Sequence, residues 1–318
     1  MAPSTESRAS GAIWGVCVGD ALGGPVQFMG PNTFSRVTEL AFVKPFRKPE
    51  GSFIDSHGQY NHALAIQNFL DWIANGRFST ADSAWDIGFS TRLSLAIWQR
   101  HGTKDLPGTQ QRVHEKFDRE RQSGNGSLMR ISSVGVVLWR NPELARQVAR
   151  QQSQVTHPAL ACGEACELYT ELVCGIMNGK DKEQLWQTVT SFPLTHPALT
   201  ERLAQYKTIA DWQAKPDADI RSSGWVVDTL EVAFWAFFKY DSWTDGVLAA
   251  VNLGGDADTA AAVYGGLAGV FYGYESIPRD WVDRMQNREM IRDIATKLSQ
   301  VASQPQQPDQ SSQSTPER

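Results

Sequence analysis

The sequence predicts an all-α fold, built as a single compact multi-helix domain. Apolar residues recur at every third or fourth position through most of the chain, which is the period of an amphipathic helix. Alternating apolar and polar runs bounded by hairpin turns, which indicate strands, are nearly absent. Gly-rich polar breaks separate the helical stretches, and such loops are where a helical scaffold collects reactive side chains.

The expected helices each carry their apolar residues on one face. The stretches are 9–24, 62–75, 82–101, 142–155, 159–179, 223–240 and 259–272. Four of the tryptophans fall on these apolar faces, so they are expected in the core. They are Trp14, Trp72, Trp225 and Trp235.

Length and composition indicate a globular protein with a proper core. The chain has 318 residues, of which 41% are hydrophobic and 20% charged. Its net charge of −5 offers no electrostatic basis for binding nucleic acid or an anionic membrane. We expect a flexible N-terminus (1–8), a folded domain (9–301) and a disordered Gln, Ser and Pro tail (302–318).

The cysteines indicate an intracellular protein. All four lie in apolar helical contexts, which predicts buried, reduced thiols and a cytoplasmic location. The opening "MAPSTESRAS" lacks the apolar core of a signal peptide, and no uncharged stretch is long enough to span a membrane.

The stretch "NLGGDADT" places two carboxylates at the start of the long uncharged run 259–272. A helix N-terminus favours one acid, because unpaired backbone N–H groups and the helix dipole stabilise a negative group there. Asp256 and Asp258, followed by the hydroxyl of Thr259, form a compact set of hard oxygen atoms suited to Mg²⁺ or Mn²⁺. The alternative is a capped helix with one additional surface acid.

Five short motifs occur in order along the chain. They are Gly-Asp-Ala-Leu-Gly with Pro25 (19–25), Gly-Asn-Gly through Met-Arg (124–130), Thr-His-Pro (156–158), "SGWVVDTLEVAFWAF" (223–237) and "NLGGDADT" (252–259). Together they resemble the ADP-ribosylglycohydrolase family, all-α hydrolases of the dinitrogenase-reductase-activating type, over nearly the whole ordered chain.

The resemblance implies a metal-assisted glycosidase. In that family, two divalent ions lie between the second loop and the final Asp-x-Asp-Thr, where they bind ribose hydroxyls and activate water for attack on the anomeric carbon. It implies that Asp256 and Asp258 are metal ligands, with Thr259 completing the corner.

Four further residues are candidates for binding substrate. Gly124, Asn125 and Gly126 would form a pocket wall whose backbone N–H groups suit a diphosphate. The alternative for this Gly-Asn-Gly is a simple turn with positive φ. His157 either joins the pocket or fixes the start of the next helix.

The second loop departs from the family's Thr-Asp-Asp-Thr. Here it is "GSFIDSHGQYN", and two registers are open, which place either residues 54–57 or residues 55–58 on the motif. In both registers a carboxylate is lost. Asp55 is the remaining acid, a candidate metal ligand and catalytic residue, and His57 is a candidate substitute ligand or general base. The alternative for His57 is a solvent-exposed or helix-capping loop residue.

The opening loop departs as well. It carries Gln27 where the family has Glu, and an amide can coordinate a cation but cannot act as a base. Asp20 either lines the pocket or caps the glycine turn. Because the acidic ligands are fewer, one Mg²⁺ or Mn²⁺ ion is expected rather than two.

The sequence therefore predicts a hydrolase that cleaves a glycosidic bond to ribose, with reduced or altered metal dependence. Its substrate would be an ADP-ribosyl or nucleoside-type molecule or an ADP-ribosylated protein. Two alternatives stay open: a non-catalytic descendant that binds ADP-ribose or a partner, and a hydrolase repurposed for a specialised pathway.

Overall fold

Helices make up the fold, as predicted. The computed structural model describes residues 2–40, 60–77, 79, 83–84 and 86–304, and within these ranges it contains no named β-strand. The α-helices are α1 (Thr5–Gly23), α2 (His62–Asn75), α3 (Phe89–His101), α4 (Leu106–Phe117), α5 (Ser132–Leu138), α6 (Pro142–Gln154), α7 (Leu160–Met177), α8 (Lys182–Ser191), α9 (Pro197–Leu203), α10 (Ile209–Ala214), α11 (Val226–Lys239), α12 (Trp243–Asn252), α13 (Ala257–Tyr272), α14 (Arg279–Arg284) and α15 (Arg288–Ser303). The 3₁₀ segments are η1 (Gly24–Val26), η2 (Glu120–Gln122), η3 (Asn125–Arg130), η4 (Asp217–Asp219) and η5 (Tyr274–Ser276).

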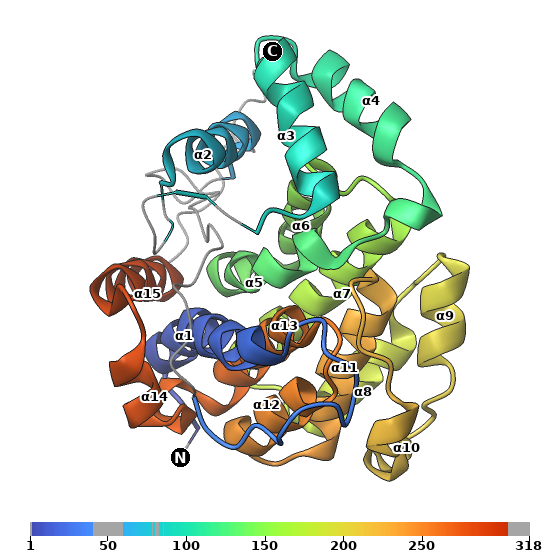
Figure 1. Ribbon diagram of the computed structural model, residues 1–318, viewed down its shortest axis with the longest axis vertical. Helices are drawn as coiled ribbons and strands as arrows, with labels where there is room; N and C mark the ends of the chain where they lie inside the picture. Colours follow the sequence, from blue (N-terminus) through green and yellow to red (C-terminus); the bar gives the residue numbers. More distant parts are fainter. Residues whose placement is uncertain (1, 41–59, 78, 80–82, 85, 305–318) are drawn as a thin grey trace, which may run out of the picture.

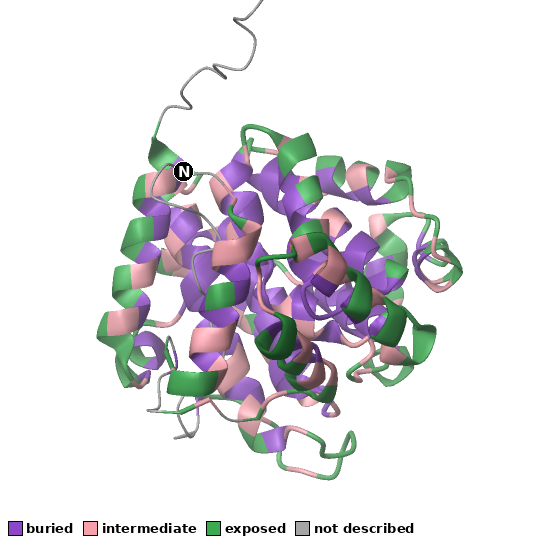
Figure 2. Cartoon of the chain, turned by 90° about the horizontal axis from the view of Figure 1, so that it is seen from above, coloured by how far each residue is buried: buried purple, intermediate pink, exposed green. Residues whose placement is uncertain are grey.

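Helices α1 and α13 cross the middle of the molecule side by side (Figure 1). Every residue of α13 from Ala257 to Val270 is buried. A helix that is apolar on all sides needs neighbours on all sides. These neighbours include α1, α7, α11 and α12. Figure 2 shows that the buried residues gather in the interior of the molecule.

Glycines let α1 and α13 approach until their backbones touch. A Cβ added to any of three α1 glycines would collide with a carbonyl oxygen of α13, and these glycines are spaced four residues apart so that they share one face. The pairs are Gly11 with Gly269, Gly15 with Gly265 and Gly19 with Ala261. Gly23 continues this face and packs against the backbone of Asp258. This packing therefore brings the end of α1 to the start of α13.

Most of the expected helices form close to their expected bounds, and 62–75 coincides with α2. The stretch 82–101 differs, because its helix begins only at Phe89, after Gly88 as N-cap. The first helix begins at Thr5, four residues before the expected start of the domain, because the Ser4 side chain caps it by accepting from the backbone N–H of Ser7. Ser7 is buried, and its Oγ accepts from the backbone N–H of Tyr274. At the other end α15 extends to Ser303, and residues 305–318 of the expected tail lie outside the described residues.

The expected core is confirmed with one exception. Trp14, Trp72 and Trp235 are buried, and the four cysteines are buried and free. Trp225 is only half-buried, because it stands just before the first turn of α11 rather than on its apolar face. None of the helices in the described part of the chain is long and apolar enough to cross a membrane.

Candidate active site

The two acids of the Asp-x-Asp stretch lie at the N-terminus of α13, as predicted. Asp256 is the N-cap residue and Asp258 lies in the first turn, and they are 8% and 6% exposed. Gly254 and Gly255 precede them with φ of +67° and +63°, a conformation that other residues adopt only at a cost in free energy. Thr259 is buried, and its backbone N–H donates to Asp258 Oδ1 at 2.7 Å.

Asp256, Asp258 and Thr259 form what we call the acidic corner. The opening loop (19–28) is joined to it by paired backbone hydrogen bonds. The N–H of Phe28 donates to the Gly255 carbonyl at 2.6 Å, and the N–H of Gly255 donates to the Met29 carbonyl at 2.8 Å. Loops 19–28 and 254–259 therefore lie side by side. Gln27 is half-buried at the end of η1, one residue before this pairing, and Asp20 is half-buried in the last turn of α1.

The Gly-Asn-Gly loop (124–126) contacts the same acidic corner through the side chain of Asn125. Asn125 is buried, and its Nδ2 donates to Asp256 Oδ2 at 2.6 Å and to Thr229 Oγ1 at 2.8 Å. Neither Asn125 nor its flanking Gly124 and Gly126 has a positive φ, so the alternative of a positive-φ turn is wrong. The loop instead places the side-chain amide of Asn125 against the carboxylate of Asp256.

His157 packs against this loop. A Cβ on Gly126 would lie 2.6 Å from His157 Cε1, so only glycine leaves room for the ring. The ring Nδ1 lies 2.8 Å from Thr156 Oγ1. Burial, and in second place the positive charge of Arg130, lower the pKa of His157 to about 3, so the ring is neutral at neutral pH. The following helix begins at Leu160 after Ala159, which forms no side-chain cap, so His157 does not cap it.

Arg130 ties the Gly-Asn-Gly loop to the Thr-His-Pro segment. Its guanidinium is buried and donates to Gly126 O at 3.1 Å, Gln152 O at 3.1 Å and Thr156 Oγ1 at 2.8 Å. Burial lowers the pKa of Arg130 to about 10, so it stays cationic at neutral pH. The sequence shows Arg130 only as the last residue of the motif 124–130, and its role in joining two loops was not predicted. Its place in that motif is the signal that could have indicated this role.

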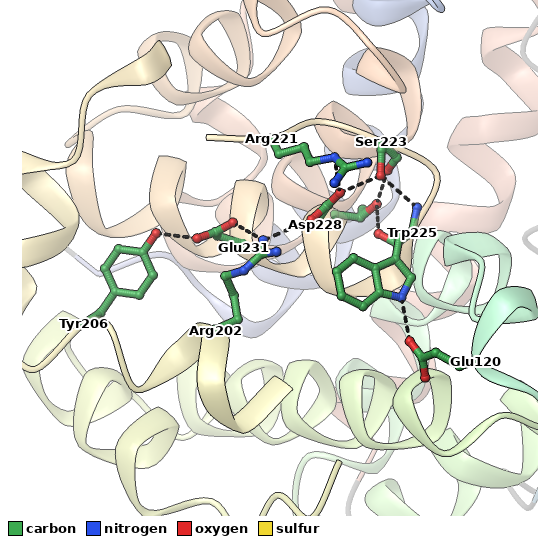
Figure 3. Close-up of polar contacts among 9 residues, drawn as sticks. Glu120, Arg202, Tyr206, Arg221, Ser223, Trp225, Asp228 and Glu231 are labelled. Carbon is green, nitrogen blue, oxygen red and sulfur yellow. Dashed lines mark hydrogen bonds and ion pairs between the residues drawn. The ribbon is translucent and has the colours of Figure 1, made fainter. Parts of the chain in front are cut away.

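Trp225 stands beside these loops, where its indole is held at one edge (Figure 3). Its Nε1 donates to Glu120 Oε1 at 3.1 Å, and Glu120 Oε2 lies 2.8 Å from His196 Nε2. The Arg202 guanidinium lies 5.7 Å from the ring centroid. An isolated backbone bridge pairs Trp225 with Gly124. The apolar pattern of the sequence predicts Trp225 in the core, and its place beside the Gly-Asn-Gly loop was not predicted. A tryptophan directly after Ser-Gly at a helix start could have indicated that place.

Comparison with known proteins decides the family. The family model described as ADP-ribosylglycohydrolase matches residues 1–308. The chain belongs to the ADP-ribosylglycohydrolase family. It is 30% identical to an ADP-ribosylarginine hydrolase (Tri1) of Serratia proteamaculans, over 95% of this chain and 82% of the relative.

Two further relatives extend the comparison. The ADP-ribosyl-[dinitrogen reductase] glycohydrolase of Rhodospirillum rubrum is 25% identical, over 93% of this chain and 97% of the relative. A solved structure described as an ADP-ribosylglycohydrolase-related protein complex superposes with a TM-score of 0.68 at 28% identity, covering 94% of this chain and 99% of that one. By both sequence and fold, the chain therefore belongs to a family of glycosidic-bond hydrolases.

The ADP-ribosylglycohydrolase family is generally metal-dependent, and the described residues supply part of a cation site. Asp258 is a buried carboxylate, and no described Lys, Arg or His forms an ion pair with it. A buried carboxylate is unfavourable unless a positive group compensates it, and hard oxygen donors suit a divalent ion. Within the described part of the chain, no three His, Cys, Asp or Glu side chains converge on one point. Asp55 and His57 lie outside the described residues, so the register of their loop stays a prediction.

Proposed function

We propose that this ADP-ribosylglycohydrolase hydrolyses the bond between ADP-ribose and an arginine side chain of a modified protein. Water adds to the anomeric carbon, the bond from that carbon to the guanidine nitrogen breaks, and the leaving nitrogen takes a proton. The single observation that supports this most is the meeting of Asp256 and Asp258 with the Asn125 amide at one corner. Two relatives at 30% identity that are named ADP-ribosylarginine hydrolases support the choice of arginine.

Asp256, Asp258 and Thr259, with Asp55 from the second loop, would hold one Mg²⁺ or Mn²⁺ ion. When bound, such an ion supplies a Lewis acid that activates water and orients the ribose hydroxyls. Asn125 donates to Asp256 Oδ2 and so orients this carboxylate. In this proposal His57 assists as a ligand or as a base.

The remaining residues of the site would bind the ADP part of the substrate. The backbone N–H groups of Gly124 and Gly126 would bind a diphosphate, whereas the N–H of Asn125 is already donated to the Gly224 carbonyl. Neutral His157 packs against Gly126 on this loop. Trp225, held by Glu120, offers an indole face to a purine ring. Gln27 stands at the rim of the acidic corner, and Asp20 supports the end of α1. Four buried free thiols favour a reducing, cytoplasmic location.

A non-catalytic ADP-ribose-binding protein is the second candidate. Gln27 and the altered second loop favour it, because each position lacks a carboxylate that the family motif carries. A hydrolase repurposed for a specialised pathway is a variant of the first candidate, the ADP-ribosylarginine hydrolase. In it His57 would replace the lost acid, and the group released from ribose would differ.

The deciding experiment uses the full chain with an ADP-ribosylarginine-modified protein, with and without Mn²⁺, and measures released ADP-ribose. Titration calorimetry with ADP-ribose is run in parallel. Metal-dependent release supports the hydrolase, whereas binding of ADP-ribose without release supports the binding protein. Neither binding nor release would overturn both.

A further inference from the structure

Two buried acids share one arginine at the N-terminal half of α11. Asp228 and Glu231 are 0% and 2% exposed and lie one helical turn apart. Arg202 Nη1 donates to Asp228 Oδ1 at 3.0 Å and also to Glu231 Oε2. The hydroxyl of Tyr206 donates to Glu231 Oε1 at 2.5 Å, so the acids lie in one connected network (Figure 3).

Only Asp228 extends this network to the turn that precedes α11. Its Oδ2 accepts a hydrogen bond from Ser223 Oγ at 2.6 Å and lies 3.3 Å from Arg221 Nε. Ser223 is held twice more, because its Oγ accepts from the N–H of Trp225 at 3.2 Å and its carbonyl accepts from Thr229 Oγ1 at 3.1 Å. Asp228 therefore anchors the segment 221–225, which we name the α11 turn.

The α11 turn forms one side of the acidic corner. The carbonyl of Gly224 accepts from the N–H of Asn125 at 3.0 Å, and a Cβ on Gly224 would lie 3.6 Å from Asp256 Oδ2. The carbonyl of Ser222 lies so close to Gly255 that a Cβ there would collide with it. Thr229, which bonds the Ser223 carbonyl, also accepts from the Asn125 side chain. The position of the α11 turn thus sets the position of Asn125 and Gly255 relative to Asp256.

We propose that Asp228 is a positioning residue of the active site, which holds the α11 turn so that Asn125 orients the Asp256 carboxylate. This inference rests on the proposed function for its activity readout alone. A buried ion pair is by itself weak evidence for a role in stability, because replacing it by packed apolar residues is often neutral or stabilising. A fully satisfied polar network instead selects one geometry, and here that geometry extends to Asp256.

Glu231 provides a matched control. Asp228→Asn and Glu231→Gln each exchange a buried carboxylate bonded to Arg202 for an amide of the same shape, but only Asp228 touches the α11 turn. Ser223→Ala is the second test variant, because it removes the hydrogen bond between Ser223 and Asp228 and leaves the ion pairs of both acids with Arg202 in place.

The melting temperature, the Mn²⁺ affinity by calorimetry, and kcat and KM for an ADP-ribosylarginine protein are measured for each variant. Hydrogen exchange is measured for the backbone amides of Asn125 and Val226, because these donate to the carbonyls of Gly224 and Ser123 and so link the α11 turn to the Gly-Asn-Gly loop. We expect a loss of kcat and Mn²⁺ affinity of about tenfold to a hundredfold in Asp228→Asn, a smaller loss in Ser223→Ala and near-wild-type values in Glu231→Gln. KM should change less than kcat, and the exchange of the two amides should rise only in the first two variants.

The proposal is overturned if Asp228→Asn and Ser223→Ala match Glu231→Gln in exchange and in kcat. If the wild-type chain binds no Mn²⁺ and releases no ADP-ribose, the proposed function fails, and amide exchange alone then decides whether Asp228 positions the turn. If Asp228→Asn does not fold, the comparison of Ser223→Ala with Glu231→Gln carries the test.

Discussion

The side-chain amide of Asn125 lies 2.6 Å from the carboxylate of Asp256, and 131 positions of sequence separate the two residues. The same amide also bonds Thr229, so Asn125 holds Asp256 while α11 holds Asn125. Asn125 thereby fixes the orientation of the Asp256 carboxylate through its Oδ2.

Asn125→Ala should reduce turnover by about tenfold to a hundredfold, because a partner that orients a ligand typically contributes that much. The measurement is kcat with an ADP-ribosylarginine protein in saturating Mn²⁺. Asn178→Ala is the control, since Asn178 is an exposed amide that bonds only the backbone of Trp139 and Cys174. Equal activity of the two variants would contradict the orienting role.

Asp256→Asn and Asp258→Asn should each abolish binding of divalent metal, because they remove the two acids of the corner. Titration calorimetry with Mg²⁺ and Mn²⁺ measures this. Asp245→Asn serves as control, since Asp245 is an exposed acid in the first turn of α12. Unchanged affinity in both test variants would remove the metal site from this corner.

Restoring carboxylates should restore a second metal ion. In the first register of the second loop the change is Ser56→Asp with Gln27→Glu, and in the second register it is His57→Asp. We expect a second bound ion, counted by native mass spectrometry, and some gain in ADP-ribosyl hydrolysis in one of the two variants, because bridging carboxylates offset the charge of paired ions. The responding variant also identifies the register. A wild-type chain that already holds two ions and turns over rapidly would show that this account of the loop is wrong.

His157 should make the protein less stable in mild acid. Its folded-state pKa of about 3 lies below its ordinary value of 6.5, so between these values the unfolded chain takes up a proton that the folded chain excludes. The stabilisation is complete above pH 6.5 and is lost as the pH falls toward 3, by at most about 1.4 kcal/mol per pH unit. Urea unfolding at pH 7, 5.5 and 4 tests this.

In that experiment His157→Gln should show a smaller loss of stability on acidification than the wild-type chain. Replacing the exposed His101 with Gln should leave the pH dependence unchanged. A His157 variant with the full wild-type pH dependence would show that other groups cause the acid sensitivity.

Gly15→Ala should destabilise the fold despite the higher helix propensity of alanine. The added Cβ would collide with the Gly265 carbonyl, and forcing two packed backbones apart costs about 1–3 kcal/mol or more. Gly163→Ala in α7 is the matched control, because the nearest atom is 3.4 Å away on the flexible Arg150 side chain. There we expect a gain of about 0.5–1 kcal/mol. Unfolding free energies from denaturant titration decide between the two outcomes.

Residue spacing alone was enough to predict α2 and the two acids at the start of α13. The period of apolar residues predicts α2 from His62 to Asn75, and an uncharged run behind two acids predicts a buried helix with Asp256 and Asp258 at its start. Both are local properties, because a helix repeats within a few residues and its N-terminus attracts acids wherever it lies. The order of the five motifs added the family and, through it, the meeting of the loops.

Contacts between distant segments were decided only by the tertiary structure. The glycines of α1 are visible in the sequence, but their partner α13 is not, since packing faces are chosen by the whole set of helices. Trp225 reads as apolar in its helix, yet Glu120 and the backbone of Gly124 hold it half-exposed beside the site. Asp228 lies in a buried run where a carboxylate is unfavourable by itself, and only the arrival of Arg202 and Ser223 from other segments satisfies it.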